Sequence, residues 1–467
     1  MAETLTTEVA RPRALIASVR LGGVSEEEHA ASVAEIKRLV DTLGFDVVAQ
    51  MTQLRAKLDP GTVFGKGKLG DLARYTGGTG VVVRGPPKVK TKVQEAYDEA
   101  QDDEDVGEPL PDEDDEPYGD EVVAPPGGPV ADVIVVDHEL SPQQLRNLEK
   151  ACACEVIDRT GVIVEIFHRH AKSREAKLQV EIARLNYLAP RLRETTGQRQ
   201  RGGIGQKGAG ESGVELDRRK IRDRLCELKD ELEAIQGESD TRRARRKDAF
   251  RVALVGYTNA GKSSLMRALT GSEVYVADKL FATLDTTVRA LWPETKPRIL
   301  VSDTVGFIKK LPHDLVASFR STLDEAGEAS LLLHVVDAAD PDFRDQMRVT
   351  REVLGEIKAD DVPRRLVLNK ADRVDEAGLV ALAAEFPDAL IVSAKTPEGL
   401  KTVRDAVVAF FNGAMIEAEL FVRWDQQNVV GAIHELNVLS EVHEDEGTRF
   451  MVRALASAVD RIKGLLA

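Results

Sequence analysis

Short apolar runs alternate with segments of helical periodicity through the first third of the chain. The strands are expected at Arg13–Val19, Phe45–Met51, Ala131–Val136 and Glu155–Ile157, and the helices at Ser25–Leu43 and Ser141–Ala151. Because alternating strands and helices favour an α/β arrangement, residues 12–159 are predicted to form a small α/β domain. Residues 1–11 lack such a pattern and are predicted to be a disordered tail.

The pattern becomes helical over residues 160–192 and again over 214–236. Apolar residues in the second stretch follow the heptad spacing of a single stripe: Ile221, Leu225, Leu228, Leu232 and Ile235. In the first stretch, Leu178, Ile182 and Leu185 share one face. We therefore predict a long antiparallel helical arm over residues 160–248. The alternative is two packed helices of a larger domain.

Buried strands separated by helical segments return in residues 249–412 and predict a mostly parallel sheet. They are expected at Phe250–Val255, Arg298–Ser302, Ser330–Asp337 and Leu366–Asn369. Residues 413–467 have strand-like stretches at Ala418–Val422 and Arg449–Ala454 around a helix near Gln427–Leu439, which predicts a small α/β appendage. The fold class is therefore α/β.

One short segment accounts for the net charge of −15. Residues 95–121 contain fifteen acidic residues and no Lys or Arg, so the rest of the chain balances to zero. Such a composition, also rich in Pro and Gly, cannot bury enough apolar surface to fold, and we predict a disordered insertion at about residues 84–129. The overall charge therefore does not argue against a polyanionic partner.

Cysteine usage and hydropathy set the expected compartment. Three cysteines, Cys152, Cys154 and Cys226, are too few for a disulfide framework and fit a reducing environment. No window holds the ~18 consecutive apolar residues of a membrane span, and residues 1–13 contain no apolar signal region. We expect no membrane span and a cytoplasmic monomer, part of which associates with membranes.

The segment Gly256–Ser263, GYTNAGKS, lies between a predicted strand and a predicted helix. This is the context of the GxxxxGKS phosphate-binding loop, whose backbone N–H groups surround phosphate oxygens. We expect Lys262 to reach the terminal phosphates and the Ser263 hydroxyl to bind Mg²⁺. The other residues of this region expected to contact nucleotide are Gly256, Tyr257, Thr258, Asn259, Ala260, Gly261 and Ser264.

Two further segments follow in the order that a GTPase requires. Thr283, in FATLDTT, is expected to complete the Mg²⁺ shell and meet the γ-phosphate, with Thr286 as second choice. Asp303-Thr304-Val305-Gly306 is a DxxG motif, in which Asp303 would hold Mg²⁺ through water and the Gly306 N–H would contact the γ-phosphate. The candidate catalytic residues are Lys262, Thr283 and Gly306. Loss of the γ-phosphate would release both segments.

The remaining motifs select guanine. In Asn369-Lys370-Ala371-Asp372, an NKxD motif, the carboxylate of Asp372 would accept two N–H bonds from guanine. Adenine lacks this donor pair, and a stranded buried carboxylate costs on the order of 1–3 kcal/mol or more. Ser393-Ala394-Lys395 would complete the site, with the Ala394 N–H on the guanine oxygen. The expected substrate is GTP with Mg²⁺, and GDP is the product.

Phe307 occupies the position after DxxG where many GTPases carry a glutamine that orients the attacking water. Because phenylalanine cannot hydrogen-bond to water, we predict slow intrinsic hydrolysis that a partner accelerates. His313 and Arg320 are candidate helpers. Asn259 is a candidate to hold a monovalent cation, K⁺, against the phosphates.

A glycine-rich loop, residues 201–211, joins the two predicted helices of the arm. It contains GxGxxG, but an Arg-rich helix rather than a strand precedes it, so we reject a dinucleotide site. Residues 191–224 carry ten basic and five acidic residues, which favours contact with phosphates. The alternative is a solvated helical face.

The motifs together resemble the HflX family of GTPases: GGIGQKGAGE, GYTNAGKSSL, FATLDTT, DTVGF, NKAD and SAK. In the N-terminal part, Leu140–Pro142, Arg146–Lys150 and Val156–Gly161 add to the resemblance. The acidic insertion departs from the family pattern. The resemblance implies binding to the large ribosomal subunit and its rRNA, with the glycine loop reaching the peptidyl-transferase region. It also implies splitting or rescue of stalled ribosomes under stress.

Two other functions stay open. One is a GTPase that acts in ribosome assembly or tRNA modification, which would associate with precursor subunits or a modification enzyme. The other is a GTP-gated regulator of a protein partner. Binding to such a partner would be insensitive to salt, whereas binding to RNA weakens steeply as salt rises.

Overall fold

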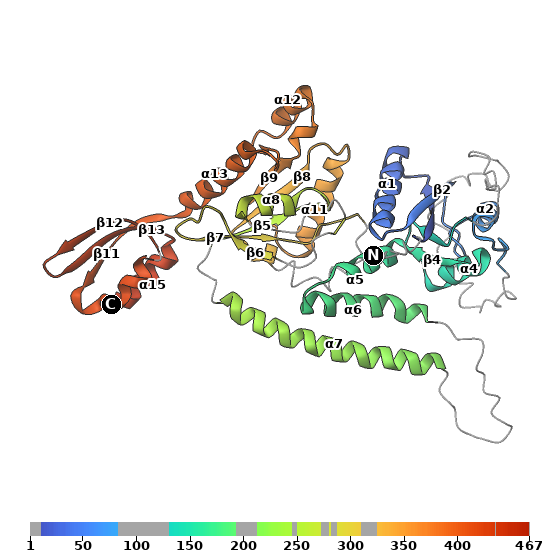
Figure 1. The fold of residues 1–467 in the computed structure, drawn as a ribbon, viewed down its shortest axis with the longest axis horizontal. Coiled ribbons are helices and arrows are strands. Elements are labelled where there is room, and N and C mark those ends of the chain that lie inside the picture. The colour runs from blue at the N-terminus through green and yellow to red at the C-terminus, as the bar shows by residue number, and fades with distance from the viewer. Residues whose placement is uncertain are drawn as a thin grey trace, which may run out of the picture. The chain divides into compact units, whose positions relative to one another are not determined.

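The computed structural model describes residues 11–82, 130–192, 213–244, 250–271, 280–281, 287–309, 325–434 and 436–466. These residues form two compact units, Met1–Ile166 and Phe167–Ala467 (Figure 1). The predicted acidic insertion and the glycine loop 201–211 lie outside the described residues.

The first unit contains a four-stranded parallel sheet of order β2-β1-β3-β4. Its strands are β1 (Arg13–Leu21), β2 (Asp46–Arg55), β3 (Val133–Val136) and β4 (Glu155–Asp158), and its helices are α1 (Glu26–Thr42), α2 (Lys66–Thr76) and α4 (Pro142–Cys152). The predicted cap of α1 is confirmed, because the Ser25 hydroxyl accepts from the Glu28 N–H over 3.1 Å. The predicted strands and helices of this region are confirmed, and α2 is an additional helix.

A buried ionic cluster lies where β3 and β4 end. Arg159 begins α5 (Arg159–His170) and is only 2% exposed. Its guanidinium donates to Asp137 Oδ1 over 2.6 Å and to the Glu35 carboxylate. The Ser32 hydroxyl donates to Asp137 Oδ2 over 2.6 Å. A buried charge requires such partners, so the cluster fixes α5 and α1 against the ends of the sheet.

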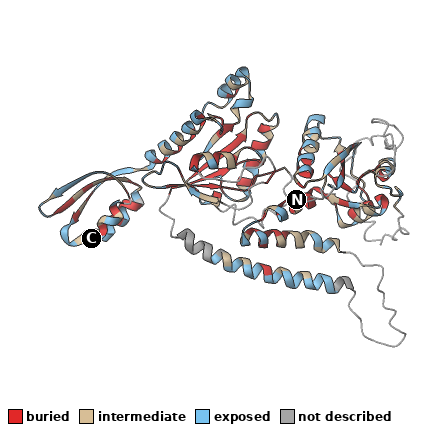
Figure 2. Cartoon of the chain, in the orientation of Figure 1, coloured by how far each residue is buried: buried red, intermediate tan, exposed pale blue. Residues whose placement is uncertain are grey.

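The arm consists of α6 (Arg174–Leu188), a short 3-10 helix η1 (Ala189–Arg191) and α7 (Gly213–Ala244). The prediction of one continuous helical stretch over residues 160–192 was wrong, because α5 ends at His170 and Ser173 caps a new helix. The predicted apolar stripes do meet, in a cluster formed by Leu178, Ile182, Leu185, Leu225, Leu228, Leu232 and Ile235. Figure 2 shows that most of the remaining described surface of α7 is exposed.

A six-stranded sheet of order β10-β9-β8-β5-β7-β6 forms the next part, with only β6 antiparallel to its neighbour. The strands are β5 (Phe250–Val255), β6 (Thr287–Ala290), β7 (Ile299–Asp303), β8 (Leu331–Asp337), β9 (Arg364–Asn369) and β10 (Leu390–Ile391). The mostly parallel sheet predicted from the sequence is therefore confirmed.

Helices cover both faces of this sheet. They are α8 (Lys262–Thr270), α11 (Phe343–Glu356), α12 (Glu376–Glu385) and α13 (Pro397–Ala414). A short 3-10 helix, η2 (Ala371–Arg373), follows β9. One core cluster joins the strands to α8 and α13, and two others join them to α11 and α12. The parallel strands place their carboxyl ends at one edge, where the binding loops of such folds lie.

The last part is a three-stranded antiparallel sheet of order β11-β13-β12 with its own core. Its elements are β11 (Ile416–Arg423), η3 (Trp424–Val429), α14 (Val430–His434), β12 (Asn437–Glu444), β13 (Gly447–Ala454) and α15 (Ala456–Leu466). The helix predicted at Gln427–Leu439 extends too far, because β12 begins at Asn437 and Val438 pairs with Val452. Cross-strand pairing has overridden the helical pattern there.

Candidate active site

The segment GYTNAGKS turns between β5 and α8 through two positions that require glycine. Gly256 has φ of 150°, and a Cβ there would lie 2.1 Å from the Val335 carbonyl oxygen. Gly261 has φ of 93°, and a Cβ there would lie 2.2 Å from Asn369 Nδ2. The backbone therefore passes close to β8 and β9, as a phosphate-binding loop requires.

Lys262 is the first residue of α8 and is only 6% exposed. Its ammonium donates to the carbonyl oxygens of Gly256 and Tyr257 over 3.0 and 2.8 Å. Burial lowers the pKa of Lys262 to about 8, and the charge of Asp303 acts in the opposite direction. The ammonium thus lies against the start of the loop that would surround the phosphates.

Ser263 and Asp303 form the second pair of the site. The Ser263 hydroxyl donates to Asp303 Oδ2 over 2.7 Å, and Asp303 is fully buried at the end of β7. A hydroxyl and a carboxylate at this spacing are hard oxygen donors of the kind that Mg²⁺ prefers. The predicted metal ligands Ser263 and Asp303 therefore lie together and fit the ion.

The rest of the DxxG motif lies against the phosphate-binding loop. The Thr304 hydroxyl donates to the Leu254 carbonyl over 2.7 Å, which attaches the segment to β5. Val305 is 6% exposed. A Cβ on Gly306 would lie 2.9 Å from Thr258 Cα and 3.0 Å from Lys262 Nζ. Gly306 therefore lies directly beside the lysine, where only glycine fits.

Asn369 lies at the end of β9 and connects two loops. Its Nδ2 donates to the Ala260 carbonyl over 2.9 Å, and its Oδ1 accepts from the Ala394 N–H over 3.0 Å. The Ala394 N–H was expected to face the guanine oxygen. In the structure the Ala394 N–H instead donates to the side chain of Asn369.

Asp372 is exposed and is held by the loop that ends in Lys395. The Ser393 hydroxyl donates to Asp372 Oδ1 over 2.7 Å, and Lys395 Nζ lies 3.5 Å from Asp372 Oδ2. The Ser393 hydrogen bond holds the pKa of the Asp372 carboxyl below its usual value, and the charge of Lys395 acts in the same direction. The carboxylate is thus ionised and oriented to accept N–H bonds.

Asp337, which the sequence analysis missed, lies beside the predicted site residues. Lys370 has φ of 61°, and its Nζ lies 2.8 Å from Asp337 Oδ2 at the end of β8. The signal was an acidic residue directly after a buried strand, at the edge where the other motifs lie. The pair fixes the Lys370 stem beside Gly261, where a Cβ would lie 4.0 Å from Lys370 Cε.

Phe307 is only 1% exposed and belongs to a core cluster between the sheet and α11. Its neighbours in that cluster include Val255, Leu332 and Leu354. The side chain is therefore part of the hydrophobic core.

Several predicted residues lie outside the described part of the chain. They are Thr283, Thr286, His313 and Arg320, together with the glycine loop 201–211. Asn259 is described: it is exposed and has φ of 58°.

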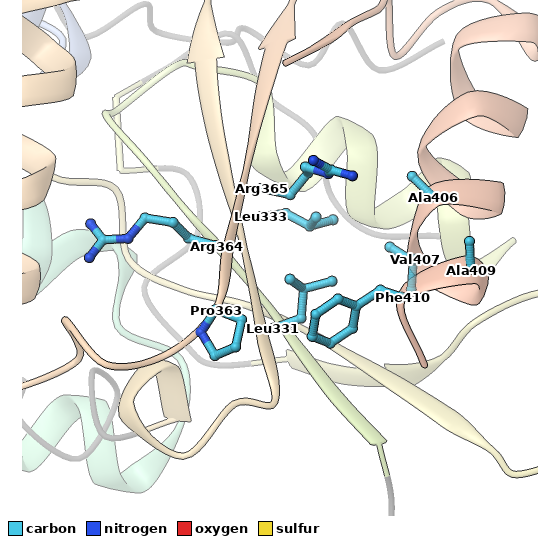
Figure 3. A pocket seen from close by; sticks show the side chains of 9 residues that line it. All are labelled: Leu331, Leu333, Pro363, Arg364, Arg365, Ala406, Val407, Ala409 and Phe410. Atoms are coloured by element: carbon cyan, nitrogen blue, oxygen red, sulfur yellow. The ribbon is translucent and has the colours of Figure 1, made fainter. Parts of the chain in front are cut away.

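A pocket of about 430 Å³ lies at the opposite edge of the same sheet (Figure 3). It is lined by Leu331, Leu333, Pro363, Arg364, Arg365, Ala406, Val407, Ala409 and Phe410. These residues come from the amino ends of β8 and β9 and from α13, whereas the motif residues follow the carboxyl ends of the strands. The pocket is therefore separate from the candidate active site.

None of the helices that the structure describes is long and apolar enough to span a membrane.

Three family models match the chain. A GTP-binding GTPase N-terminal model matches residues 30–84 and 127–168, and a GTP-binding GTPase middle-region model matches residues 170–246. The model described as a 50S ribosome-binding GTPase matches residues 251–370. Together with the loops described above, these matches define a P-loop GTPase, which binds GTP and hydrolyses it to GDP and phosphate.

Relatives of known family make the assignment specific. The chain is 55% identical over 459 residues to the GTPase HflX of Gluconacetobacter diazotrophicus, covering 98% of each chain. It is 40% identical over 331 residues to the GTPase HflX of Escherichia coli, covering 69% of this chain and 78% of that one. The chain belongs to the HflX family of GTPases, as its motifs had indicated.

Among solved structures, a GTP-binding protein from Sulfolobus solfataricus in complex with GDP is similar over 85% of this chain and 98% of its own. The identity is 22% and the TM-score is 0.41.

Proposed function

We propose that this GTPase binds the large ribosomal subunit and its rRNA, and that it splits or rescues stalled ribosomes under stress. The observation that carries the proposal is the match of residues 251–370 to a family model described as a 50S ribosome-binding GTPase. The composition of residues 191–224, with ten basic against five acidic residues, suits contact with RNA phosphates.

The nucleotide site supports the chemical part of this cycle. Lys262 would hold the terminal phosphates, and the Gly306 N–H beside it would contact the γ-phosphate. Ser263 and Asp303 would hold Mg²⁺, with Thr283 as the third ligand, and the bound ion would neutralise charge that develops on the phosphates. Asp372 would accept the two N–H bonds of guanine, and Ser393 orients it.

A partner would be required because the residue at the usual water-orienting position, Phe307, cannot hydrogen-bond to water. Phe307 is buried in the core and leaves the attacking water without a hydrogen-bond acceptor from that position. Ribosome binding would supply or order the missing group. Asn259, exposed in the phosphate-binding loop, would hold K⁺ against the phosphates through its side-chain oxygen.

The arm would dock on RNA through its exposed basic residues. Arg218, Arg219, Lys220 and Arg222 are exposed near the start of α7, next to the glycine loop in sequence. The leucine cluster between α6 and α7 would hold this surface in place. In the GTP-bound state the arm would bind the large subunit, binding energy would separate the subunits, and hydrolysis would release the protein.

The test is GTP turnover by the purified protein, with and without purified large subunits. We expect strong stimulation by the subunits, and loss of that stimulation when residues 201–211 are deleted. In a control variant, a Gly/Ser linker of equal length replaces the loop. Because this variant keeps the chain length, it distinguishes the effect of the loop's own residues from the effect of shortening the chain.

Intact ribosomes provide the second part of the test. With a non-hydrolysable GTP analogue and 70S particles, sedimentation should show free subunits. Normal basal turnover without stimulation would overturn the proposal. Binding limited to precursor subunits would instead favour ribosome assembly, and salt-insensitive binding to a protein would favour a GTP-gated regulator.

A further inference from the structure

The backbone of the DxxG segment is bonded to the phosphate-binding loop just beyond Gly306. Phe307 donates its N–H to the Gly256 carbonyl over 3.1 Å and accepts from the Thr258 N–H over 2.8 Å. Tyr257 and Phe307 thus form an isolated parallel β-bridge. On the DxxG side, both of these backbone hydrogen bonds involve Phe307. The residues that follow Phe307 are attached to the phosphate-binding loop through a side chain.

Tyr257 provides this second attachment. Its ring is only 4% exposed, and its hydroxyl accepts from the Lys309 N–H over 2.8 Å. The ammonium of Lys309 in turn pairs with the Asp345 carboxylate in α11. Lys309 is therefore fixed from both sides: its backbone to the phosphate-binding loop and its side chain to a helix of the scaffold.

These contacts determine where Gly306 lies. A Cβ at this position would be 2.9 Å from Thr258 Cα and 3.0 Å from Lys262 Nζ, so the Gly306 peptide contacts the loop directly. A peptide N–H held beside the lysine that binds the terminal phosphates needs little rearrangement to meet a γ-phosphate. GDP has no γ-phosphate, so its binding should not depend on this placement.

We propose that the Tyr257 hydroxyl is a positioning group for GTP hydrolysis, which holds the DxxG segment so that the Gly306 N–H lies at the γ-phosphate position. The proposal rests on the role of Gly306 given above. In a phosphate-binding loop that acts mainly through backbone groups, the side chain of Tyr257 serves the neighbouring segment. The Lys309–Asp345 pair supports the same placement from the other side.

The test is Tyr257→Phe, which keeps the ring and removes the hydroxyl that accepts from the Lys309 N–H. Affinity for a non-hydrolysable GTP analogue should fall about fivefold, the effect of losing one ordinary hydrogen bond, and affinity for GDP should not change. Intrinsic kcat, measured without ribosomes, should fall by a similar factor. The ratio of the two affinities is the decisive quantity, because general damage to the fold would lower both.

Tyr75→Phe is the matched control, since it removes a tyrosine hydroxyl from α2 of the other unit. Asp345→Asn is the second variant: it weakens the Lys309 pair without touching the loop and should shift the ratio in the same direction. It also carries the test if Tyr257→Phe does not fold. An unchanged ratio with unchanged kcat, an equal fall in both affinities, or an increase in kcat would each overturn the proposal. None of these measurements includes ribosomes, so their outcome is independent of the ribosomal proposal.

Discussion

Asn369 donates its side-chain N–H to the backbone carbonyl of Ala260 over 2.9 Å, across 109 residues of sequence. The donor belongs to the NKxD motif and the acceptor to the phosphate-binding loop. The same side chain also accepts from the Ala394 N–H, so one buried amide joins three loops. The proposed base and phosphate sites are therefore connected into one assembly through this side chain.

Replacing this amide should weaken the binding of GDP and GTP equally. Asn369→Ala removes two buried hydrogen bonds, each worth about 1 kcal/mol with further cost for the stranded partners, so affinity for GDP and GTP should fall at least about tenfold. Equilibrium titration with a fluorescent guanine nucleotide measures the loss. The control is Asn412→Ala, at an exposed position in α13. A selective loss of GTP alone would contradict the assembly.

Asp372→Asn should change the preferred base. An amide accepts only one of the two guanine N–H bonds and places its own N–H against the other, so guanine affinity should fall by about 3 kcal/mol or more. Xanthine presents a carbonyl at that edge, which the new N–H can meet. Competition between GDP and xanthosine diphosphate measures the exchange, and Asp375→Asn provides the control. If the affinities for GDP and xanthosine diphosphate fall by the same factor, Asp372 does not contact the base.

The lowered pKa of Lys262 predicts that nucleotide affinity depends on pH. Its pKa in the free protein is lowered to about 8, so the ammonium needed by the phosphates is present below pH 8 and is lost above it. Affinity for GDP should be flat from about pH 7, above the second pKa of its terminal phosphate, to pH 8, and fall by up to about tenfold per pH unit above it. Lys262→Gln should bind more weakly and without this dependence. A wild-type profile that stays flat up to about pH 10, near the usual lysine pKa, would contradict the assignment.

The same shift predicts how stability depends on pH. Between about pH 8 and 10.4 the unfolded lysine stays protonated while the folded one does not, so the unfolded state binds more protons. The free energy of unfolding of the nucleotide-free protein should therefore gain a positive contribution as pH rises through this window. Comparing wild type with Lys262→Gln by denaturant unfolding isolates that contribution.

Leu228→Ala should disrupt the arm without affecting the nucleotide site. Leu228 is fully buried between α6 and α7, and its truncation should cost the helix pair about 2–5 kcal/mol. Ribosome-stimulated turnover should fall, whereas GDP affinity and intrinsic turnover should stay as in wild type. The control is Leu216→Ala, because Leu216 is 42% exposed on the same helix. Full stimulation with a locally unfolded arm would show that the arm does not mediate ribosome binding.

Much of the fold follows from local sequence pattern. The strands before each motif are short apolar runs, and the residues after them are glycine, Asp and Asn, which are poor strand formers. This is why the sequence alone could place Lys262, Ser263, Asp303 and Asn369 at one edge of the sheet. The heptad stripe of α7 likewise predicted its contact with α6.

Other features depend on contacts that no local pattern reveals. Arg159, Asp137 and Glu35 lie far apart in the sequence, and each alone suggests an exposed charge rather than a buried cluster. The hydrogen bond between Tyr257 and Lys309 joins residues 52 positions apart and is equally invisible. The sequence analysis missed the whole of β12, whose strand character comes from pairing with β13.

The buried position of Phe307 has a consequence for how the molecule uses GTP. Because that side chain fills the core, a glutamine placed there would have to bury its amide or disrupt the packing, so one substitution cannot restore self-sufficient hydrolysis. Together with the proposed dependence on a partner, this predicts that a molecule without its partner consumes little GTP, and that the rate of nucleotide use reports how often the two meet.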